Sequence, residues 1–232
     1  MPQLIAMIIV VVGAMIYMFQ TFGGTGDKIE GIAQKTSVIT EINNIKNGLK
    51  LAARSGSIAT ADNATNDEYN KLAGIAKLKY FAEQINEQIS KDKDGVLRTT
   101  TDFNTYAAIS FGGNSDNATS ATADMIIRLV ANTKGQIPGI FVDLSRGGLK
   151  DGAGFLESQI ANDLKSVATI DRKANVATAT DTPAAGALRT TGTDVEKRIP
   201  VETTGADTLL NDGMFTIYFQ DFGSNEVVID NN

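Results

Sequence analysis

The chain has no cysteine and no histidine among its 232 residues. The missing cysteines exclude disulfides and cysteine nucleophiles, and the missing histidines exclude imidazole acid–base chemistry and ordinary zinc sites. Positive charge is also scarce, because 21 Lys and Arg stand against 27 Asp and Glu, a net charge of −6. This acidity disfavours nucleic acid as a partner, since phosphates are neutralised by clustered cations. Most hydrolase and oxidoreductase sites are therefore excluded before any motif is considered.

The first 26 residues lack charge altogether. The run from Leu4 to Phe19 is almost wholly apolar, and with its flanks it reaches about 20 residues, enough to cross a bilayer core of about 30 Å. A helix that is apolar on all sides must be buried in lipid or in protein. Three interpretations compete: a secretory signal peptide, a signal anchor, and a mature chain whose basic leader has been removed. Because no Lys or Arg precedes Lys28, the sequence favours the third.

A glycine-rich stretch follows this run. Gly23, Gly24 and Gly26 each cost a helix about 1 kcal/mol relative to Ala, which predicts a melted hinge over residues 23–26. A flexible linker behind a membrane anchor is the alternative. Apolar residues then recur at spacings of three and four, which predicts an amphipathic helix over 27–55 that ends before Gly56. Its charged residues are expected on the face away from the core: Lys28, Glu30, Lys35, Glu41, Lys46 and Lys50.

Residues 56–232 are expected to form a globular head. The predicted helices are one that begins with the capping-box spacing of Thr65 and Glu68 and ends near Gly95, a short one over 124–131, and one over 153–168. The predicted strands cover 106–111, 140–144 and a hairpin of 214–220 with 226–230, and 169–195 is a long surface excursion. The fold class is α+β, with a long N-terminal helix (apolar half, glycine break, amphipathic half) packed on an antiparallel sheet with peripheral helices.

These features resemble a type IV pilin, most closely the type IVb class of the toxin-coregulated pilin. Met1 and the uncharged run fit the processed N-terminus of that class, and residues 23–26 lie where such pilins lose helix inside the filament. Four runs of the head are similar to the type IVb globular domain: Tyr106-Ala-Ala-Ile-Ser-Phe-Gly-Gly, Ile140-Phe-Val-Asp-Leu, Asp151-Gly-Ala-Gly-Phe-Leu-Glu-Ser-Gln-Ile-Ala and Thr193-Asp-Val-Glu-Lys. The resemblance covers most of the chain with few identical residues.

The resemblance implies an assembly route. A prepilin peptidase would remove the leader, Met1 would be N-methylated, and residues 1–22 would hold the subunit in the cytoplasmic membrane. The assembly machinery would then extract it into a helical homopolymer at the cell surface, which serves adhesion, aggregation or motility. The residues expected in the filament core are Met1, Leu4, Ile5, Ile8, Ile9, Val12, Ile16, Phe19 and Phe22.

The chain departs from the family at two points. Pilins usually carry Glu at the fifth mature position, where it neutralises the N-terminal amine of a neighbour, but this chain has Ile5. The Met1 amine must then be neutral, solvated or paired otherwise, because an unpaired buried charge is costly. The family disulfide is also missing. Its half-cystines align near Ile126 and Ile199, which are expected to pack as an apolar pair instead.

Other motifs have weaker chemical interpretations. The run Asp92-Lys93-Asp94-Gly95 has part of a calcium-loop pattern but lacks the remaining ligands, so a turn that ends a helix is favoured. Asn63 and Asn117 begin N-glycosylation sequons, and the Thr-rich stretches offer sites for O-glycans; plain polar loops are the alternative. No catalytic, metal or cofactor site is expected. A membrane-anchored extracytoplasmic binding protein is the alternative to the pilin subunit, and an anchored enzyme is a third option.

Overall fold

The computed structural model describes residues 31–59, 69–92, 94–97, 104–113, 123–130, 134–173 and 210–229. The chain divides into two units between Ser37 and Val38. Of the first unit, residues 31–37 are described, and they are helical. The second unit, which begins at Val38, contains the sheet, the remaining helices and the hydrophobic core. This division places the whole described head on the C-terminal side of Ser37.

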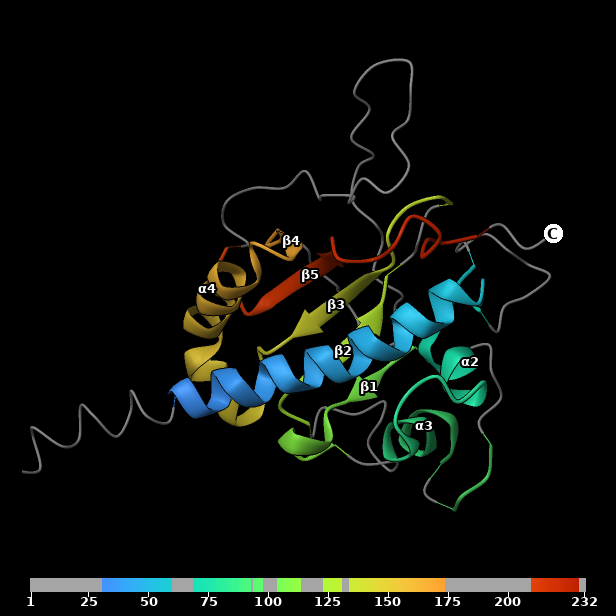
Figure 1. The fold of residues 1–232 in the computed structure, drawn as a ribbon. Coiled ribbons are helices and arrows are strands. Elements are labelled where there is room, and N and C mark those ends of the chain that lie inside the picture. The colour runs from blue at the N-terminus through green and yellow to red at the C-terminus, as the bar shows by residue number, and fades with distance from the viewer. Residues whose placement is uncertain are drawn as a thin grey trace, which may run out of the picture. The chain divides into compact units, whose positions relative to one another are not determined.

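An antiparallel sheet of five strands, in the order β1-β2-β3-β5-β4, lies at the centre of the head (Figure 1). The strands are β1 (Tyr106–Ala107), β2 (Ile126–Leu129), β3 (Gly139–Asp143), β4 (Ala168–Asp171) and β5 (Met214–Phe219). The central strand β3 pairs Val142 with Ile127 on one side and with Phe215 on the other. Residues paired across neighbouring strands project their side chains to the same side of the sheet. Ile127, Val142 and Phe215 therefore mark the face of the sheet that packs in the core. The predicted α+β class is confirmed.

The N-terminal helix is described over residues 31–54, and it crosses one face of the sheet from Val38 onward (Figure 1). Its buried residues Val38, Ile42, Ile45 and Leu49 follow the three-and-four spacing of a helix stripe. They share one hydrophobic cluster with Ile127, Val142 and Phe215 of the sheet. The helix ends where Gly56 adopts a positive φ of 67°, with the Ser57 amide bonded to the Ala52 carbonyl at 2.8 Å. The predicted end before Gly56 is confirmed.

The predicted second amphipathic helix is wrong in one respect: the structure has two helices there, α2 (Leu72–Lys77) and α3 (Glu83–Ser90). Between them Lys79 has a φ of 61°, which no continuous helix allows. The break turns Phe81 toward the N-terminal helix, where its ring lies against Gly48. Asn86 stabilises the break by accepting a hydrogen bond of 3.1 Å from the Phe81 amide. The start expected at Thr65–Glu68 lies outside the described residues.

The short helix predicted over 124–131 is also wrong, because residues Ile126–Leu129 form strand β2. All four of its residues are buried, as they are in a strand covered on both faces. Pairing with β1 and β3 decides the outcome, since local apolar spacing fits a short helix equally well. The strand predicted over 106–111 is shorter than expected: after Ala107 the chain turns into a 3₁₀ helix, Ile109–Phe111, closed by Gly112 at φ 78°.

The predicted C-terminal hairpin has only its first arm. Strand β5 is confirmed, but its neighbours are β3 and β4 rather than residues 226–230. Instead, Ile229 donates a hydrogen bond of 2.9 Å to the Ile58 carbonyl, next to the end of the N-terminal helix. The start of the predicted excursion over 169–195 is part of β4, whereas 174–195 lies outside the described residues.

Two further elements agree with the sequence. The strand expected over 140–144 is β3, and the helix expected over 153–168 is α4 (Ala153–Leu164). A 3₁₀ helix, Gly147–Gly152, leads into α4. The apolar residues of α4 that face the core are Ala153, Leu156, Ile160 and Leu164.

Candidate functional site

The residues expected to assemble the filament lie outside the described residues, since these begin at Gly31. The same holds for Gly23, Gly24 and Gly26, for Asn63 and Asn117, and for Ile199. Ile126 is described, and it is buried in a small cluster with Ala107 and Ala123. Among the described helices, none is both long and apolar enough to cross a membrane. The described residues therefore bear on function through the surface of the head and through the contacts that hold its segments together.

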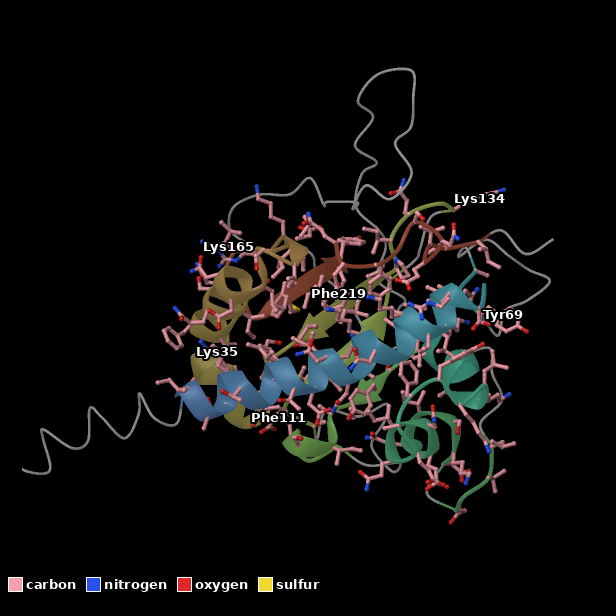
Figure 2. The ribbon with its side chains drawn as sticks, in the orientation of Figure 1. Lys35, Tyr69, Phe111, Lys134, Lys165 and Phe219 are labelled. Atoms are coloured by element: carbon pink, nitrogen blue, oxygen red, sulfur yellow. The ribbon has the colours of Figure 1, made fainter. Side chains whose placement is uncertain are left out.

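Of the charged residues predicted on the solvent-facing side of the N-terminal helix, Glu41, Lys46 and Lys50 bond to the head instead. Lys28 and Glu30 lie outside the described residues. Lys46 and Lys50 turn sideways onto the segment after β5, where the Lys46 ammonium lies 2.6 Å from the Asp221 carboxylate. The Lys50 ammonium donates a hydrogen bond of 2.8 Å to the Asp221 carbonyl. The Lys46 ammonium also lies 5.0 Å above the ring centre of Phe219, which is labelled in Figure 2. The two lysines thus fasten the C-terminal segment to the helix.

Arg54 extends this contact by one turn. Its Nε donates a hydrogen bond of 3.0 Å to the Glu226 carboxylate, whose side chain is 5% exposed. Burial opposes ionisation of Glu226, but the hydrogen bond from the Gly223 amide and the Arg54 guanidinium outweigh it and lower the pKa. Glu226 is therefore a fixed negative charge between the helix and the C-terminal loop.

Glu41 was also predicted on the solvent-facing side, and that prediction is wrong. The residue is 3% exposed, and its carboxylate accepts a hydrogen bond of 2.7 Å from the Tyr106 hydroxyl and one of 3.0 Å from the Ser110 amide. Burial first, and then the Glu41 charge, raise the pKa of Tyr106 well above its usual range. A buried carboxylate with two donors is the arrangement that burial of charge requires. In the sequence, Glu41 directly precedes Ile42 of the apolar stripe, and this position was the sign that its side chain could be buried.

The side of the N-terminal helix that faces solvent carries no charge between Thr40 and Leu51. Its exposed residues, which we name the neutral ridge, are Thr40, Asn43, Asn44, Asn47 and Leu51. They recur at spacings of three and four, so they form one stripe along the helix. Leu51 is 50% exposed. The ridge therefore consists of small polar side chains and one large apolar one. Arg54, which is paired with Glu226 and has a side chain that is 64% exposed, follows it three residues on.

A buried carboxylate also anchors the ends of the segment between β4 and β5. Glu157 of α4 is fully buried and accepts hydrogen bonds from Arg172 Nε at 2.6 Å, the Asn211 amide at 3.1 Å and the Gly213 amide at 2.9 Å. Arg172 in turn donates to the side-chain oxygen of Asn211 at 2.7 Å. This Glu157 clasp joins both described ends of the segment 173–210. In the sequence, Glu157 directly follows Leu156 of the apolar stripe formed by Leu156, Ile160 and Leu164. This position beside the stripe was the one sign that its carboxylate could be buried.

The described head also has an open groove between α2, α3 and Leu97, with a volume of about 590 Å³. Its inner wall includes Ala76 and Phe81, and charged residues of both signs line it: Lys77, Lys79, Lys91, Glu83 and Glu87. Lys91 and Glu87 pair with each other at 2.7 Å. The size is in the range of small-molecule sites, but the lining presents no arrangement of nucleophile and base.

The calcium alternative for residues 92–95 has no support in the geometry. Asp92 Oδ1 accepts hydrogen bonds of 2.9 Å from the amides of Asp94 and Val96, and Gly95 has a φ of 76°. This is a turn after α3, as the sequence favoured. Within the described ranges, no three Asp or Glu side chains gather closely enough to hold a metal ion. Comparison of the chain with protein-family models, curated proteins and solved structures finds no match.

Proposed function

We propose that the chain is a structural subunit of a type IV pilus, closest to the type IVb class. Residues 1–22 serve first as its anchor in the cytoplasmic membrane and then as the core of an extracellular filament. The glycines at 23–26 form a melted hinge between this core helix and the head. The filament serves adhesion, aggregation or motility, and the subunit has no catalytic reaction of its own. Its partners are further copies, prepilin peptidase and the pilus assembly machinery.

The observation that carries this proposal is the contrast between residues 1–26 and the helix that follows them. The first segment is uncharged and apolar, whereas the helix from Val38 onward buries its stripe against its own sheet. The head thus buries the stripe of this helix within one chain. The N-terminal run is left to be covered by lipid or by other copies, and a contact that does not close on itself produces a filament.

An acid placed in the apolar run tests the proposal. Ile9→Asp introduces a charge that costs about 2.5–3.5 kcal/mol at the centre of a membrane segment, and it is equally unfavourable in a dry helix bundle. We expect surface filaments to disappear, as seen by electron microscopy of sheared cells. Gln84→Asp, at an exposed position of α3, should leave them unchanged. Filaments of normal number and mass with Ile9→Asp would contradict the proposal.

The groove between α2 and α3 favours one alternative, a membrane-anchored extracytoplasmic binding protein. On that alternative, residues 1–22 stay in the membrane permanently and the groove holds a small ligand. The lining lysines Lys77 and Lys79 would make an anionic ligand the best fit. Membrane fractionation separates the two functions, because an anchor never enters the sheared filament fraction.

A further inference from the structure

The groove between α2, α3 and Leu97 has a positive lining in a chain that is acidic overall. Three lysines and two glutamates line it: Lys77, Lys79, Lys91, Glu83 and Glu87. Within this set Lys91 and Glu87 pair with each other at 2.7 Å. The lining therefore has one positive charge in excess, whereas the whole chain has a net charge of −6. Such a groove favours a ligand that carries a single negative charge, because contacting surfaces are electrostatically complementary.

Lys79 is the lysine of this lining that the fold does not use. It is exposed in the turn between α2 and α3, and its ammonium makes no hydrogen bond or ion pair with any described residue. Its φ of 61° is a value that residues other than glycine and asparagine rarely adopt, because it costs stability. The Lys79 amide donates a hydrogen bond of 2.9 Å to the Ala76 carbonyl, which holds this conformation. A strained residue whose charge serves no contact in the fold is typical of a binding site.

The groove also has apolar walls. Phe81 forms part of its inner wall, and Leu97, which is 61% exposed, lines it from the segment after α3. A turn holds Leu97 in this place, since the Asp92 amide donates a hydrogen bond of 2.9 Å to the Val96 carbonyl and Leu97 pairs with Lys91 in an antiparallel bridge. An exposed leucine offers apolar area whose burial by a ligand is favourable. One groove thus combines a free cation with apolar surface.

The inner wall is fixed by contacts within the head. Asn86 accepts a hydrogen bond of 3.1 Å from the Phe81 amide and donates one of 2.6 Å to the Phe81 carbonyl. The Phe81 ring lies against Gly48 of the N-terminal helix. Ser90 donates a hydrogen bond of 2.5 Å to the Asn86 carbonyl. Because these groups are already ordered, a ligand would not have to order them, which lowers the cost of binding.

We propose that this groove binds a small monocarboxylate with an apolar body, its carboxylate at Lys79 and its body against Phe81 and Leu97. A phosphate monoester carries nearly two negative charges at neutral pH, more than the single charge that the lining has in excess. The volume of about 590 Å³ is in the range of small-molecule sites. The groove residues belong to the head and not to residues 1–22, so the inference goes beyond the pilin proposal and does not depend on it.

A matched pair of ligands tests the proposal. Binding of 4-phenylbutyrate to the full chain in neutral detergent is measured by saturation-transfer NMR, with empty micelles as the blank. The second ligand is 4-phenylbutanamide, which has the same body without the charge. We expect a Kd of about 1 mM or tighter for the carboxylate and a Kd at least tenfold higher for the amide. No binding of the carboxylate, or equal Kd values for the two compounds, would overturn the inference.

Two lysine variants locate the site. Lys79→Asn and Lys150→Asn each remove one positive charge, so they change the overall attraction of the chain for an anion equally. Asn tolerates the φ of position 79, and Lys150 is exposed in the 3₁₀ helix before α4, outside the groove. Lys79→Asn should raise the Kd for 4-phenylbutyrate at least fivefold, and Lys150→Asn should leave it unchanged. Equal Kd values for the two variants would overturn the inference.

Two further variants separate binding from folding. Lys79→Gly relieves the strained φ, so we expect a higher melting temperature together with a Kd at least fivefold higher. Leu97→Ser should raise the Kd at least threefold without lowering the melting temperature, because the side chain is exposed. A Kd equal to wild type in either variant would overturn the inference.

Filaments and binding are then compared in the same chain. Filaments of normal mass from a chain that does not bind 4-phenylbutyrate would overturn this inference alone. Absence of filaments, with binding that depends on Lys79, would overturn the pilin proposal alone. Ile9→Asp, which should abolish filaments, should bind 4-phenylbutyrate as wild type does.

Discussion

The hydroxyl of Tyr106 donates a hydrogen bond of 2.7 Å to Glu41, and this contact joins the first strand of the sheet to the N-terminal helix. Tyr106→Phe removes the donor and leaves a buried carboxylate with one partner fewer. We expect a loss of about 1.5–3 kcal/mol in the free energy of unfolding, the usual value of a hydrogen bond to a charged group. Urea denaturation of the full chain in detergent measures it.

Tyr80→Phe is the matched control. The Tyr80 hydroxyl lies 3.0 Å from the neutral Ser57 hydroxyl, so its loss should cost only about 0.5–1.5 kcal/mol. The two variants should also differ above pH 10. The raised pKa of Tyr106 means that stability is lost as the unfolded chain ionises there, and Tyr106→Phe removes that part of the loss. Equal costs for both variants would contradict a role for the Glu41 charge.

Gly48 lies inside the N-terminal helix, where Ala is ordinarily preferred by about 1 kcal/mol. In this chain we expect Gly48→Ala to destabilise the head by about 1 kcal/mol net, because a methyl group there would overlap the Phe81 ring. It would also come within 2.9 Å of the Tyr80 carbonyl oxygen, which is part of the backbone. Thermal unfolding checks this, with Asn43→Ala on the exposed side as a control that should stabilise slightly. A higher melting temperature for Gly48→Ala would show that Phe81 does not pack there.

The Glu157 clasp should contribute far more than an exposed ion pair. Glu157→Gln replaces one acceptor with a donor and removes the charge that Arg172 binds, so we expect a loss of about 3 kcal/mol. Glu87→Gln breaks the exposed pair with Lys91 and should cost far less than Glu157→Gln, because water screens an exposed pair. Chemical denaturation measures both variants. Arg172→Gln combined with Glu157→Gln should cost less than the two single losses added together, and strict additivity would contradict the clasp.

Glu226 predicts a loss of stability in acid. Its pKa is lowered in the folded chain, so its contribution is present above the ordinary Glu value and is lost as the pH falls through the folded value. Wild type should therefore exceed Glu226→Gln in stability at pH 7, and the difference should shrink steadily below about pH 4.5. Unfolding curves of both proteins between pH 7 and pH 3 test this. A difference that does not change with pH would contradict it.

Asp212 should have the opposite effect on how stability changes with pH. Burial and then the charges of Glu157 and Asp143 raise its pKa, although the Met214 amide donates to it. An acid with a raised folded pKa destabilises the chain as the pH rises through the interval above its ordinary value. Asp212→Asn, which can keep the acceptor oxygen, should therefore be more stable than wild type at pH 7 and equal to it in acid. Lower stability at pH 7 would show that the Met214 contact requires the charge.

The features that the sequence predicts correctly are those set by local pattern. The helix end before Gly56, strand β3 and helix α4 follow from periodicity and from a glycine stop. Strand β2 could not be predicted in this way, because the spacing of Ile126, Ile127 and Leu129 suits a helix or a strand. Its pairing with strands distant in sequence decides between them.

The candidate site was predictable only in part. The apolar stripe of the N-terminal helix was predicted correctly. The charged residues beside it were assigned to solvent, because no local pattern shows that Asp221 and Glu226 pack against this helix. The break between α2 and α3 depends on Phe81 meeting Gly48, a contact that joins two separate segments. The neutral ridge appears only once the lysines are seen to turn away from it.

The most direct test of the central claim is to identify the subunit in the native filament. Filaments sheared from cells that carry this chain are imaged by electron microscopy, and their N-terminal peptide is measured by mass spectrometry. The account predicts filaments built of this chain, with a peptide that begins at an N-methylated Met1. A chain absent from the filaments and kept in the membrane with an unprocessed N-terminus would contradict it.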